Sequence, residues 1–530
     1  MTAGSDSPTR RIVLAGAGAI AGAAALGGPA LGREAAPVAT TRHGPVRGAV
    51  RDGVNVFKGV RYGADTAPRR FMPALPPEPW TEIRDALEYG PASPQKSSEP
   101  NQSEDCLFLN VWTRGLRDGG KRPVMVYIHG GAHANGSGSS PLYDGVRLCQ
   151  RGDVVVVTLN HRLNVFGYGY VARLPGAGSE LADSGNVGNL DIVLALRWVR
   201  DNIAEFGGDP DRVMIFGQSG GGGKVVTLLS MPVASGLFHR AATMSGQHPT
   251  VMGPLNATRR ARAFMAHIGV ETVDALRTAP FQRLVEGLRM PDPLVEGDGV
   301  IFWSTLDMRS TAREPAYPDA PGVSKDVPLI IGTVKDETRY FLGGDEANYA
   351  LTWDDLPERL GPEMVADISP EYVVARYREL YPRYSPSDVF FAASTAGRSW
   401  RGSVILGEAR AAQDGPTWMY QVDFPSPMEG GRRGALHTID IPLVFDNIAA
   451  EGSRTGSGPE AQAMADAMSE AFIAHARAGD PNHRGIPTWP RYTLPERTAM
   501  VWDTPPHVEI DPRGAERELF AIVPYVKPGT

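Results

Sequence analysis

The sequence predicts an α/β fold with a large, mostly parallel central sheet flanked by helices. Three observations support this prediction: compact apolar runs of strand length, amphipathic helical segments that alternate with them, and an even composition over 530 residues. Alternation of strands and helices is typical of parallel sheets, because the connection between two parallel strands must cross a face of the sheet. No internal repeat or low-complexity linker divides the chain, which favours one large domain.

The strands and helices are expected in a regular order. Residues 124–128 and 154–159 are apolar runs between turn residues, as in strands buried on both faces. Apolar residues recur at three to four positions over 191–206, which predicts a helix. Residues 40–61 predict a small antiparallel start, and further strands are expected at 212–217, 239–245, 327–332, 417–424 and 499–502. A helix is expected at 224–231, and helical cap insertions are expected at 253–289 and 349–412.

Composition narrows the class of protein. The chain has 42% hydrophobic and 21% charged residues, which is typical of a globular protein. Its net charge of −7 and the lack of a dense basic block argue against a nucleic-acid partner. Beyond the N-terminal region no apolar run reaches the length of a membrane-spanning helix, so we expect no integral span in the mature chain. We expect Cys106 and Cys149 to be free buried thiols.

The first residues predict an export signal. Arg10 and Arg11 precede a weakly apolar, Ala/Gly-rich stretch, and small residues at 30–36 offer cleavage sites. This order is typical of a twin-arginine signal and predicts a secreted or periplasmic protein. We therefore expect a signal peptide over residues 1–36 and a single domain over 37–530.

The glycines of this stretch have a competing interpretation. Gly16, Gly18 and Ala21 follow a short apolar run, as in a dinucleotide-binding loop. Such a loop opens a helix inside a βαβ unit, whereas Gly-Gly-Pro at 27–29 breaks the expected helix early. An oxidoreductase with a nucleotide cofactor is therefore disfavoured.

Residues 217–221, Gly-Gln-Ser-Gly-Gly, fit the motif Gly-x-Ser-x-Gly. The motif follows a predicted strand and precedes a predicted helix, which is the sharp turn that presents the nucleophile of an α/β-hydrolase. The helix N-terminus also directs amides toward developing negative charge. We expect an α/β-hydrolase fold with Ser219 as the nucleophile.

The nucleophile needs a histidine base, a carboxylate and an oxyanion hole. In this fold the acid and then the histidine follow the serine, and residue order alone leaves the candidates His239, His248, His267, His437, His475, His483 and His507. The turn His-Gly-Gly-Ala at 129–132 follows a predicted strand and supplies oxyanion donors. His129 and His133 would bind zinc as a helical pair, but the intervening glycines oppose a helix, so we expect no metal.

Several further segments carry a specific resemblance. Residues 104–112, EDCLFLNVW, resemble the second signature of the type-B carboxylesterase family, which includes para-nitrobenzyl esterases, cholinesterases and the non-catalytic neuroligins. The segments HGGA, NHRLNVFGY, FGGDP and GQSGGG follow in the family order. The likeness runs from about residue 43 to residue 492. It implies a cofactor-independent serine hydrolase that acts on small to medium carboxylic esters.

The resemblance also implies the remaining site residues. Residues 331–337 are similar to the acid segment of the family, which makes Glu337 the acid and Asp336 its rival. Residues 434–440 resemble the histidine segment, which makes His437 the base. The implied oxyanion donors are Gly131, Ala132 and Gly220, and the implied supporting residues are Gln218, Ser245 and Asp440.

Departures from the family pattern bear on specificity. Gln218 replaces a usual glutamate, and Ala132 replaces a usual glycine and adds a methyl group at the acyl site. Ser93 stands where the family has the cysteine that pairs with the position of Cys106, and the loop at 93–106 lacks tryptophan. Cholinesterases hold a quaternary ammonium through an aromatic on this loop, so choline esters are disfavoured. The intact triad argues against a neuroligin-like binding protein, whereas amide or carbamate hydrolysis would use the same residues.

Overall fold

The computed structural model describes residues 36–246, 248–295 and 299–525. The chain divides into the units Met1–Ala36 and Pro37–Thr530, and the fold described here is that of the second unit. The expected export signal therefore lies outside the described residues, apart from Ala36.

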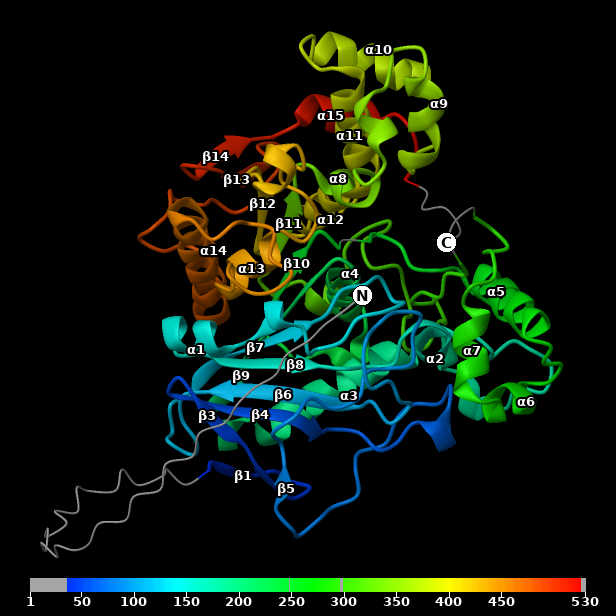
Figure 1. The fold of residues 1–530 in the computed structure, drawn as a ribbon, viewed down its shortest axis with the longest axis vertical. Helices are drawn as coiled ribbons and strands as arrows, with labels where there is room; N and C mark the ends of the chain where they lie inside the picture. Colours follow the sequence, from blue (N-terminus) through cyan, green and yellow to red (C-terminus); the bar gives the residue numbers. More distant parts are fainter. Residues whose placement is uncertain (1–35, 247, 296–298, 526–530) are drawn as a thin grey trace, which may run out of the picture. The chain divides into compact units, whose positions relative to one another are not determined.

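An eleven-stranded mixed sheet forms the centre of this unit (Figure 1). A continuous run of its strands is parallel, which confirms the predicted sheet type. In spatial order this run consists of β13 (Thr498–Trp502), β12 (Thr417–Val422), β11 (Leu329–Val334), β10 (Arg240–Met244), β9 (Gly208–Gln218), β7 (Arg122–Ile128) and β8 (Val155–Leu159).

Antiparallel strands extend the parallel run at both sides. The strands β6 (Phe108–Thr113), β4 (Val54–Arg61) and β3 (Ala49–Arg51) follow β8, and β14 (His507–Ile510) pairs with β13. The predicted antiparallel start is thus split between two sheets, because β1 (Val38–Thr40) and β2 (Pro45–Arg47) form a small separate sheet with β5 (Arg84–Asp85).

Both faces of the parallel strands are buried. In β7 the side chains of Val124, Val126 and Ile128 belong to one apolar cluster, whereas Met125 and Tyr127 belong to the other. This division follows from the strand geometry, in which successive side chains point to opposite faces. A sheet covered on both faces requires continuous apolar runs, as the sequence predicted.

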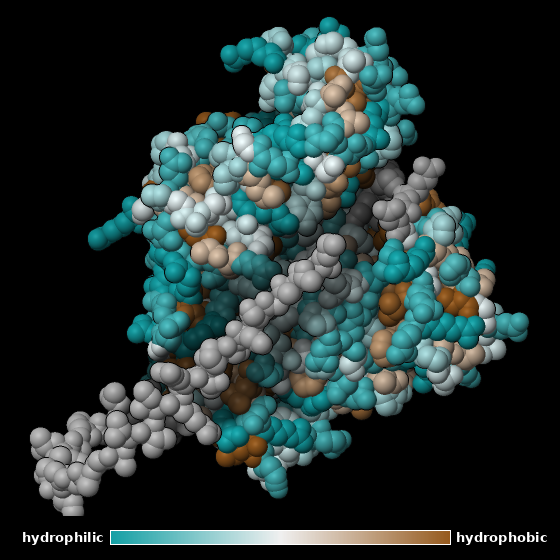
Figure 2. All heavy atoms as spheres, viewed as in Figure 1, coloured by the Kyte–Doolittle hydropathy of each residue, from teal (hydrophilic) through white to brown (hydrophobic). Residues whose placement is uncertain are grey.

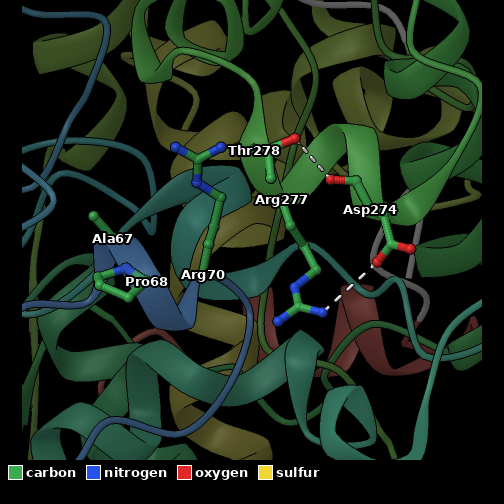
Figure 3. Close-up of a pocket in the computed structure, with 6 residues that line it drawn as sticks. All are labelled: Ala67, Pro68, Arg70, Asp274, Arg277 and Thr278. Carbon is green, nitrogen blue, oxygen red and sulfur yellow. Dashed lines mark hydrogen bonds and ion pairs between the residues drawn. The ribbon is translucent and has the colours of Figure 1, made fainter.

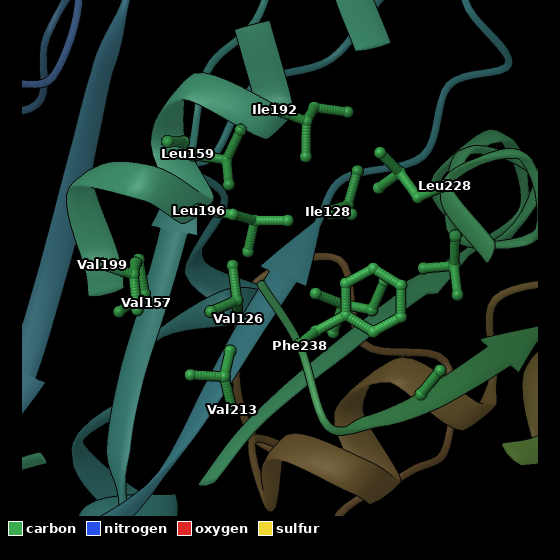
Figure 4. Close-up of a cluster of buried hydrophobic side chains, with 14 of the residues drawn as sticks. Val126, Ile128, Val157, Leu159, Ile192, Leu196, Val199, Val213, Leu228 and Phe238 are labelled. Atoms are coloured by element: carbon green, nitrogen blue, oxygen red, sulfur yellow. The ribbon is translucent and has the colours of Figure 1, made fainter. Parts of the chain in front are cut away.

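Helices cover the two faces of the sheet. Ile192, Leu196 and Val199 recur at helical spacing and pack on the strand residues Val126 and Val157 (Figure 4). The helix that carries these residues covers one face of the sheet together with two other helices, and three more helices cover the opposite face of the sheet. The first set is α3 (Val187–Asn202), α4 (Gly220–Leu229) and α12 (Arg401–Ala411), and the second is α1 (Val146–Gly152), α13 (Asp440–Phe445) and α14 (Pro459–Ala478).

Two helical insertions have apolar cores of their own, but the second is shorter than the predicted 349–412, because residues 401–411 form α12 on a face of the sheet. Figure 1 shows them at the right and at the top of the sheet. The first consists of α5 (Pro254–His267), α6 (Val273–Thr278) and α7 (Phe281–Gly287), and the second contains α9 (Leu356–Leu360), α10 (Pro370–Leu380) and α11 (Pro386–Thr395), against which α15 (Gly514–Ala521) packs.

One helix boundary differs from the sequence prediction. The helix predicted from residue 224 begins at Gly220, directly after Ser219. Glycine has a low helix propensity, but here the tight turn and close packing against β7 outweigh that preference.

The surface and the cysteines agree with a globular domain. In the view of Figure 2 the surface is mostly hydrophilic, with small hydrophobic patches. Cys106 and Cys149 are both buried and free, as predicted. None of the helices in the described ranges has the length and apolar character needed to cross a membrane.

Candidate active site

Ser219 occupies the turn between β9 and α4. Its backbone has φ 56° and ψ −126°, a conformation that is costly for a residue with a side chain. The turn requires glycine on both sides of the serine. A Cβ atom on Gly217 would lie 2.6 Å from the backbone of Gly221, and one on Gly221 would lie 2.0 Å from the carbonyl oxygen of Ile128. The structure therefore has the sharp strand-to-helix turn that the motif predicts.

The loop after β7 contacts the start of α4. Gly131 and Ala132 have φ values of 84° and 54°, and both residues are exposed. A Cβ atom on Gly220 would lie only 1.8 Å from the carbonyl oxygen of Ala132. Within the described residues the amides of Gly131, Ala132 and Gly220 donate no hydrogen bond. They remain available as donors to a negatively charged oxygen.

The carboxylate that reaches His437 is Glu337. Glu337 is the first residue of α8 (Glu337–Leu342) and is fully buried. Its Oε2 accepts a hydrogen bond from the Nδ1–H of His437, and its Oε1 accepts one from the Val334 amide at 3.3 Å. The neighbouring Asp336 instead accepts bonds from Arg339 at 3.1 Å and from the amide of Ala435 at 3.0 Å. Its carboxylate therefore has other partners.

The second ring nitrogen of His437 faces Gln218. The Nε2 of His437 lies 3.1 Å from the Nε2 of Gln218 and accepts its amide hydrogen, since the Nδ1–H is used by Glu337. Among the hydrogen bonds of the described residues, none joins Ser219 to His437. In this arrangement the Nε2 of His437 is occupied by the Gln218 amide.

The two other expected supporting residues make no hydrogen bond to His437 in the described structure. Ser245 has φ 49°, and its backbone amide donates to the carbonyl oxygen of Gly332 at 2.8 Å. Asp440 is fully buried and accepts a hydrogen bond from the Tyr420 hydroxyl at 2.9 Å. Burial and the nearby Glu337 raise the pKa of Asp440 to about 7.

Lys224 is a buried group that the sequence interpretation missed. It lies on α4, and its Nζ donates to the carbonyl oxygen of Ala132 at 2.8 Å and to that of His129 at 3.4 Å. Burial lowers its pKa to about 7. The available signal was a lysine that directly follows four glycines and opens the predicted helix at 224–231.

Aromatic rings flank His437 on α8. The ring centroids of Phe341 and Tyr340 lie 4.9 and 5.6 Å from that of His437. Each ring carries a guanidinium group, with Arg398 Cζ 4.5 Å from the Phe341 centroid and Arg454 Cζ 5.0 Å from that of Tyr340. The aromatic surface beside the histidine is therefore already covered by two cations.

A cavity of about 550 Å³ lies elsewhere, beside α6 (Figure 3). Its lining includes Arg70 and Arg277, and none of its lining residues belongs to the site predicted from the sequence. The guanidinium of Arg70 is bound to Glu104 at 2.6 Å and to the carbonyl oxygens of Leu276 and Ala279. We assign this arginine a structural role.

The site elements all follow parallel strands at their carboxyl ends. The 129–132 loop follows β7, Ser219 follows β9, Glu337 follows β11, and His437 lies in the segment after β12. In open α/β sheets this edge is where catalytic groups gather. The fold and the site together define a serine hydrolase of the α/β-hydrolase class.

Comparison with known proteins gives the family. The model of the carboxylesterase family matches residues 35–519, and the chain belongs to this family. It is 34% identical to a para-nitrobenzyl esterase of Bacillus subtilis (strain 168), over 91% of this chain and 98% of the relative. It is 33% identical to a phenmedipham hydrolase of Pseudarthrobacter oxydans, over 88% and 94% of the two chains.

A solved structure supports the same assignment. A Geobacillus stearothermophilus carboxylesterase, crystallised at pH 6.2, superposes with a TM-score of 0.81 at 37% identity, covering 91% of this chain and 99% of that chain. The protein described here is a carboxylic ester hydrolase.

Proposed function

We propose that the protein hydrolyses small to medium carboxylic esters through an acyl-enzyme on Ser219. His437 Nε2 takes the Ser219 proton as the oxygen attacks the ester carbonyl, and it then donates that proton to the departing alcohol. A water molecule, deprotonated by the same nitrogen, releases the acid and restores Ser219. Glu337 orients the imidazole through its bond to Nδ1 and stabilises the imidazolium.

The oxyanion is received by backbone amides. The amides of Gly131 and Ala132 come from the loop after β7, and that of Gly220 comes from the first residue of α4. Negative charge on the carbonyl oxygen develops only as the tetrahedral intermediate forms, so these donors favour the transition state over the bound ester. No step of this sequence requires a metal or an organic cofactor.

The observation that carries the proposal is the His437–Glu337 hydrogen bond at the sheet edge where Ser219 lies. The test is Ser219→Ala with short-chain p-nitrophenyl esters. We expect turnover to disappear while the fold remains intact. Retention of about a hundredth of the wild-type kcat would refute Ser219 as the nucleophile, since loss of a triad member typically costs far more.

A labelling experiment identifies the nucleophile independently. An organophosphate or a sulfonyl fluoride should add mass to the Ser219 peptide alone, and Ser219→Ala should remain unlabelled. Matched p-nitroanilide and carbamate substrates show whether the leaving group matters, and we expect the esters to have the highest kcat/KM. Equal or faster anilide or carbamate turnover would contradict the ester assignment.

We further propose that residues 1–36 are a twin-arginine export signal. Arg10 and Arg11 before a weakly apolar stretch support this, and the match to the family model begins only at residue 35. The N-terminal sequence of exported protein should begin between about residues 30 and 37. Replacement of both arginines by lysine should retain the precursor inside the cell, and unchanged export would contradict the proposal.

A further inference from the structure

The helix that begins after the nucleophile carries a fully buried lysine. Lys224 is 0% exposed, and among the described residues no carboxylate pairs with it. Its Nζ is bound by the carbonyl oxygens of Ala132 and His129, at 2.8 and 3.4 Å. A buried lysine without an opposite charge is costly to hold in its protonated form, so its presence at this position calls for a functional reason.

The partners of this lysine, His129 and Ala132, are the two ends of the 129–132 loop, the oxyanion loop of the proposed mechanism. The carbonyl of His129 lies in the peptide plane before Gly130, and the carbonyl of Ala132 lies in the plane after Ala132. The N–H groups of Gly131 and Ala132 belong to the two peptide planes between them. Because each peptide unit is planar, fixing the two outer planes restricts the rotation of the two inner ones.

The loop needs such a restraint. Ala132 has φ 54°, and a non-glycine residue in this left-handed region persists only when its surroundings hold it there. Its carbonyl contacts Gly220 and Lys224, which lie four residues apart on one face of α4. Helix α4 therefore presents the nucleophile at its N-terminus and restrains the oxyanion loop from the same face.

Lys224 belongs to a cluster of basic groups. The His129 ring lies 4.7 Å from that of His161, and His133 lies near enough to influence His161. Burial lowers the pKa of His129 to about 3 and that of His161 well below its usual range, so both rings are neutral at working pH. Below pH 7, where its own amine is protonated, Lys224 therefore carries the positive charge of the cluster, and above pH 7 it is a neutral hydrogen-bond donor.

We propose that Lys224 is a positioning residue of the oxyanion hole. It holds the carbonyls of His129 and Ala132 and thereby aims the Gly131 and Ala132 amides at the tetrahedral intermediate. This inference rests on the proposed function, because it requires the 129–132 loop to receive an oxyanion. Lys224 itself touches neither the substrate nor the reacting atoms.

The first test is Lys224→Met, which keeps the unbranched apolar part of the side chain and removes the amino group. Replacement of a buried charge by an apolar side chain of similar volume is commonly tolerated by the fold. We expect kcat for p-nitrophenyl acetate to fall roughly tenfold to hundredfold, somewhat less than loss of an oxyanion donor, with KM within about threefold of wild type. Thr227→Val is the matched control, since it alters another buried polar side chain of α4, whose hydroxyl donates to the carbonyl oxygen of Gly223.

The second test separates positioning from general structural support. A trifluoromethyl ketone forms an oxyanion with the nucleophile, whereas the matching methyl ketone resembles the ground state. Lys224→Met should raise the Ki of the trifluoromethyl ketone by the same factor by which kcat/KM falls, and should leave the Ki of the methyl ketone unchanged. Lys224→Gln, which keeps an uncharged donor, should give intermediate values and serves as the second variant if Lys224→Met does not fold.

The outcomes are distinguishable. A folded Lys224→Met or Lys224→Gln enzyme with wild-type kcat overturns the inference, and so does equal weakening of both ketones. Ser219→Ala is measured alongside. If that variant keeps its turnover, the proposed function fails, whatever the result at Lys224; if it is inactive and the Lys224 variants are unaffected, only the present inference fails.

Discussion

The two sides of the site are built in different ways. On the nucleophile side, Ser219 and the 129–132 loop are held mainly by backbone geometry, with positive φ at Ser219 and Ala132 and contacts that leave no room for a Cβ atom on Gly220. On the acid–base side, Glu337 and His437 are 100 positions apart and meet through a side-chain hydrogen bond.

Because of this difference, we expect the two sides to respond to different kinds of substitution. The nucleophile side has no space, so an added methyl group should damage it more than the loss of a polar atom nearby. The acid–base side depends on one charged hydrogen bond, so an isosteric change that removes the charge should damage it while packing stays intact. Each prediction below tests one side of this comparison.

The largest effect is expected at Glu337. Glu337→Gln keeps the shape of the side chain but removes the acceptor charge that orients His437, and a comparable change in a triad costs roughly 10⁴ in kcat. Asp336→Asn is the control, because its carboxylate bonds to Arg339 and the Ala435 amide. Steady-state kinetics should show a near-normal Asp336→Asn enzyme. A larger loss in that control would identify Asp336 as the acid.

The second largest loss of kcat is expected for Gly220→Ala. The new Cβ would meet the Ala132 carbonyl and displace the oxyanion loop, which should lower kcat by roughly 10² to 10³. Gly344→Ala is the control, since no atom lies within 4 Å of a Cβ there. Adding Ala132→Gly should recover part of the activity, because glycine lets the loop move aside. Wild-type kcat in Gly220→Ala would show that the two elements are not in tight contact.

A moderate effect is expected for charged substrates. Arg398 and Arg454 cover the aromatic faces beside His437, so acetylthiocholine should have a kcat/KM roughly tenfold below that of its uncharged 3,3-dimethylbutyl analogue. Arg398→Gln should raise the value for the cationic ester alone. Arg378→Gln, which removes a similar arginine–tryptophan contact at Trp353, should change neither substrate. A wild-type preference for the choline ester would contradict this picture.

The smallest effect concerns stability and pH at Lys224. Burial lowers the pKa of Lys224 from 10.5 to about 7. At pH values between these two pKa values, the lysine is protonated in the unfolded chain and neutral in the folded chain. The stability contribution of Lys224 therefore rises with pH over this range and is least favourable below pH 7. Relative to wild type, the Tm of Lys224→Met should fall by a few degrees as pH rises from 6 to about 10. Thermal unfolding of Thr227→Val should show no such trend, and a pH-independent difference for Lys224→Met would mean that Lys224 does not titrate in this range.

Much of the fold could be predicted because its signals are local. The strands at 124–128 and 154–159 have apolar runs that no exposed segment would tolerate, and both are strands of the parallel sheet. The boundary at Gly220 could not be predicted, since four glycines disfavour a helix and only packing against the loop after β7 overrides that preference.

The site divides in the same way. The turn at Ser219 and the loop at 129–132 depend on residues adjacent in the chain, so their motifs can be recognised in the amino-acid sequence. The partners of His437 were harder to predict. Residue types allowed either Asp336 or Glu337 as the acid. No local pattern indicated that Gln218, 219 positions away, would contact the imidazole ring.

The α/β architecture, the strand-to-helix turn at Ser219 and the Gly-Gly turn at 129–132 could all be predicted from the chain, because each depends on short-range periodicity or backbone sterics. Three other features became visible only in the folded molecule: the carboxylate that reaches His437, the cover of Phe341 by Arg398, and the burial of Lys224 against the 129–132 loop. The physical reason is that hydrogen bonds and charges between distant side chains depend on how the sheet and its helices bring them together, and a linear pattern does not contain those distances.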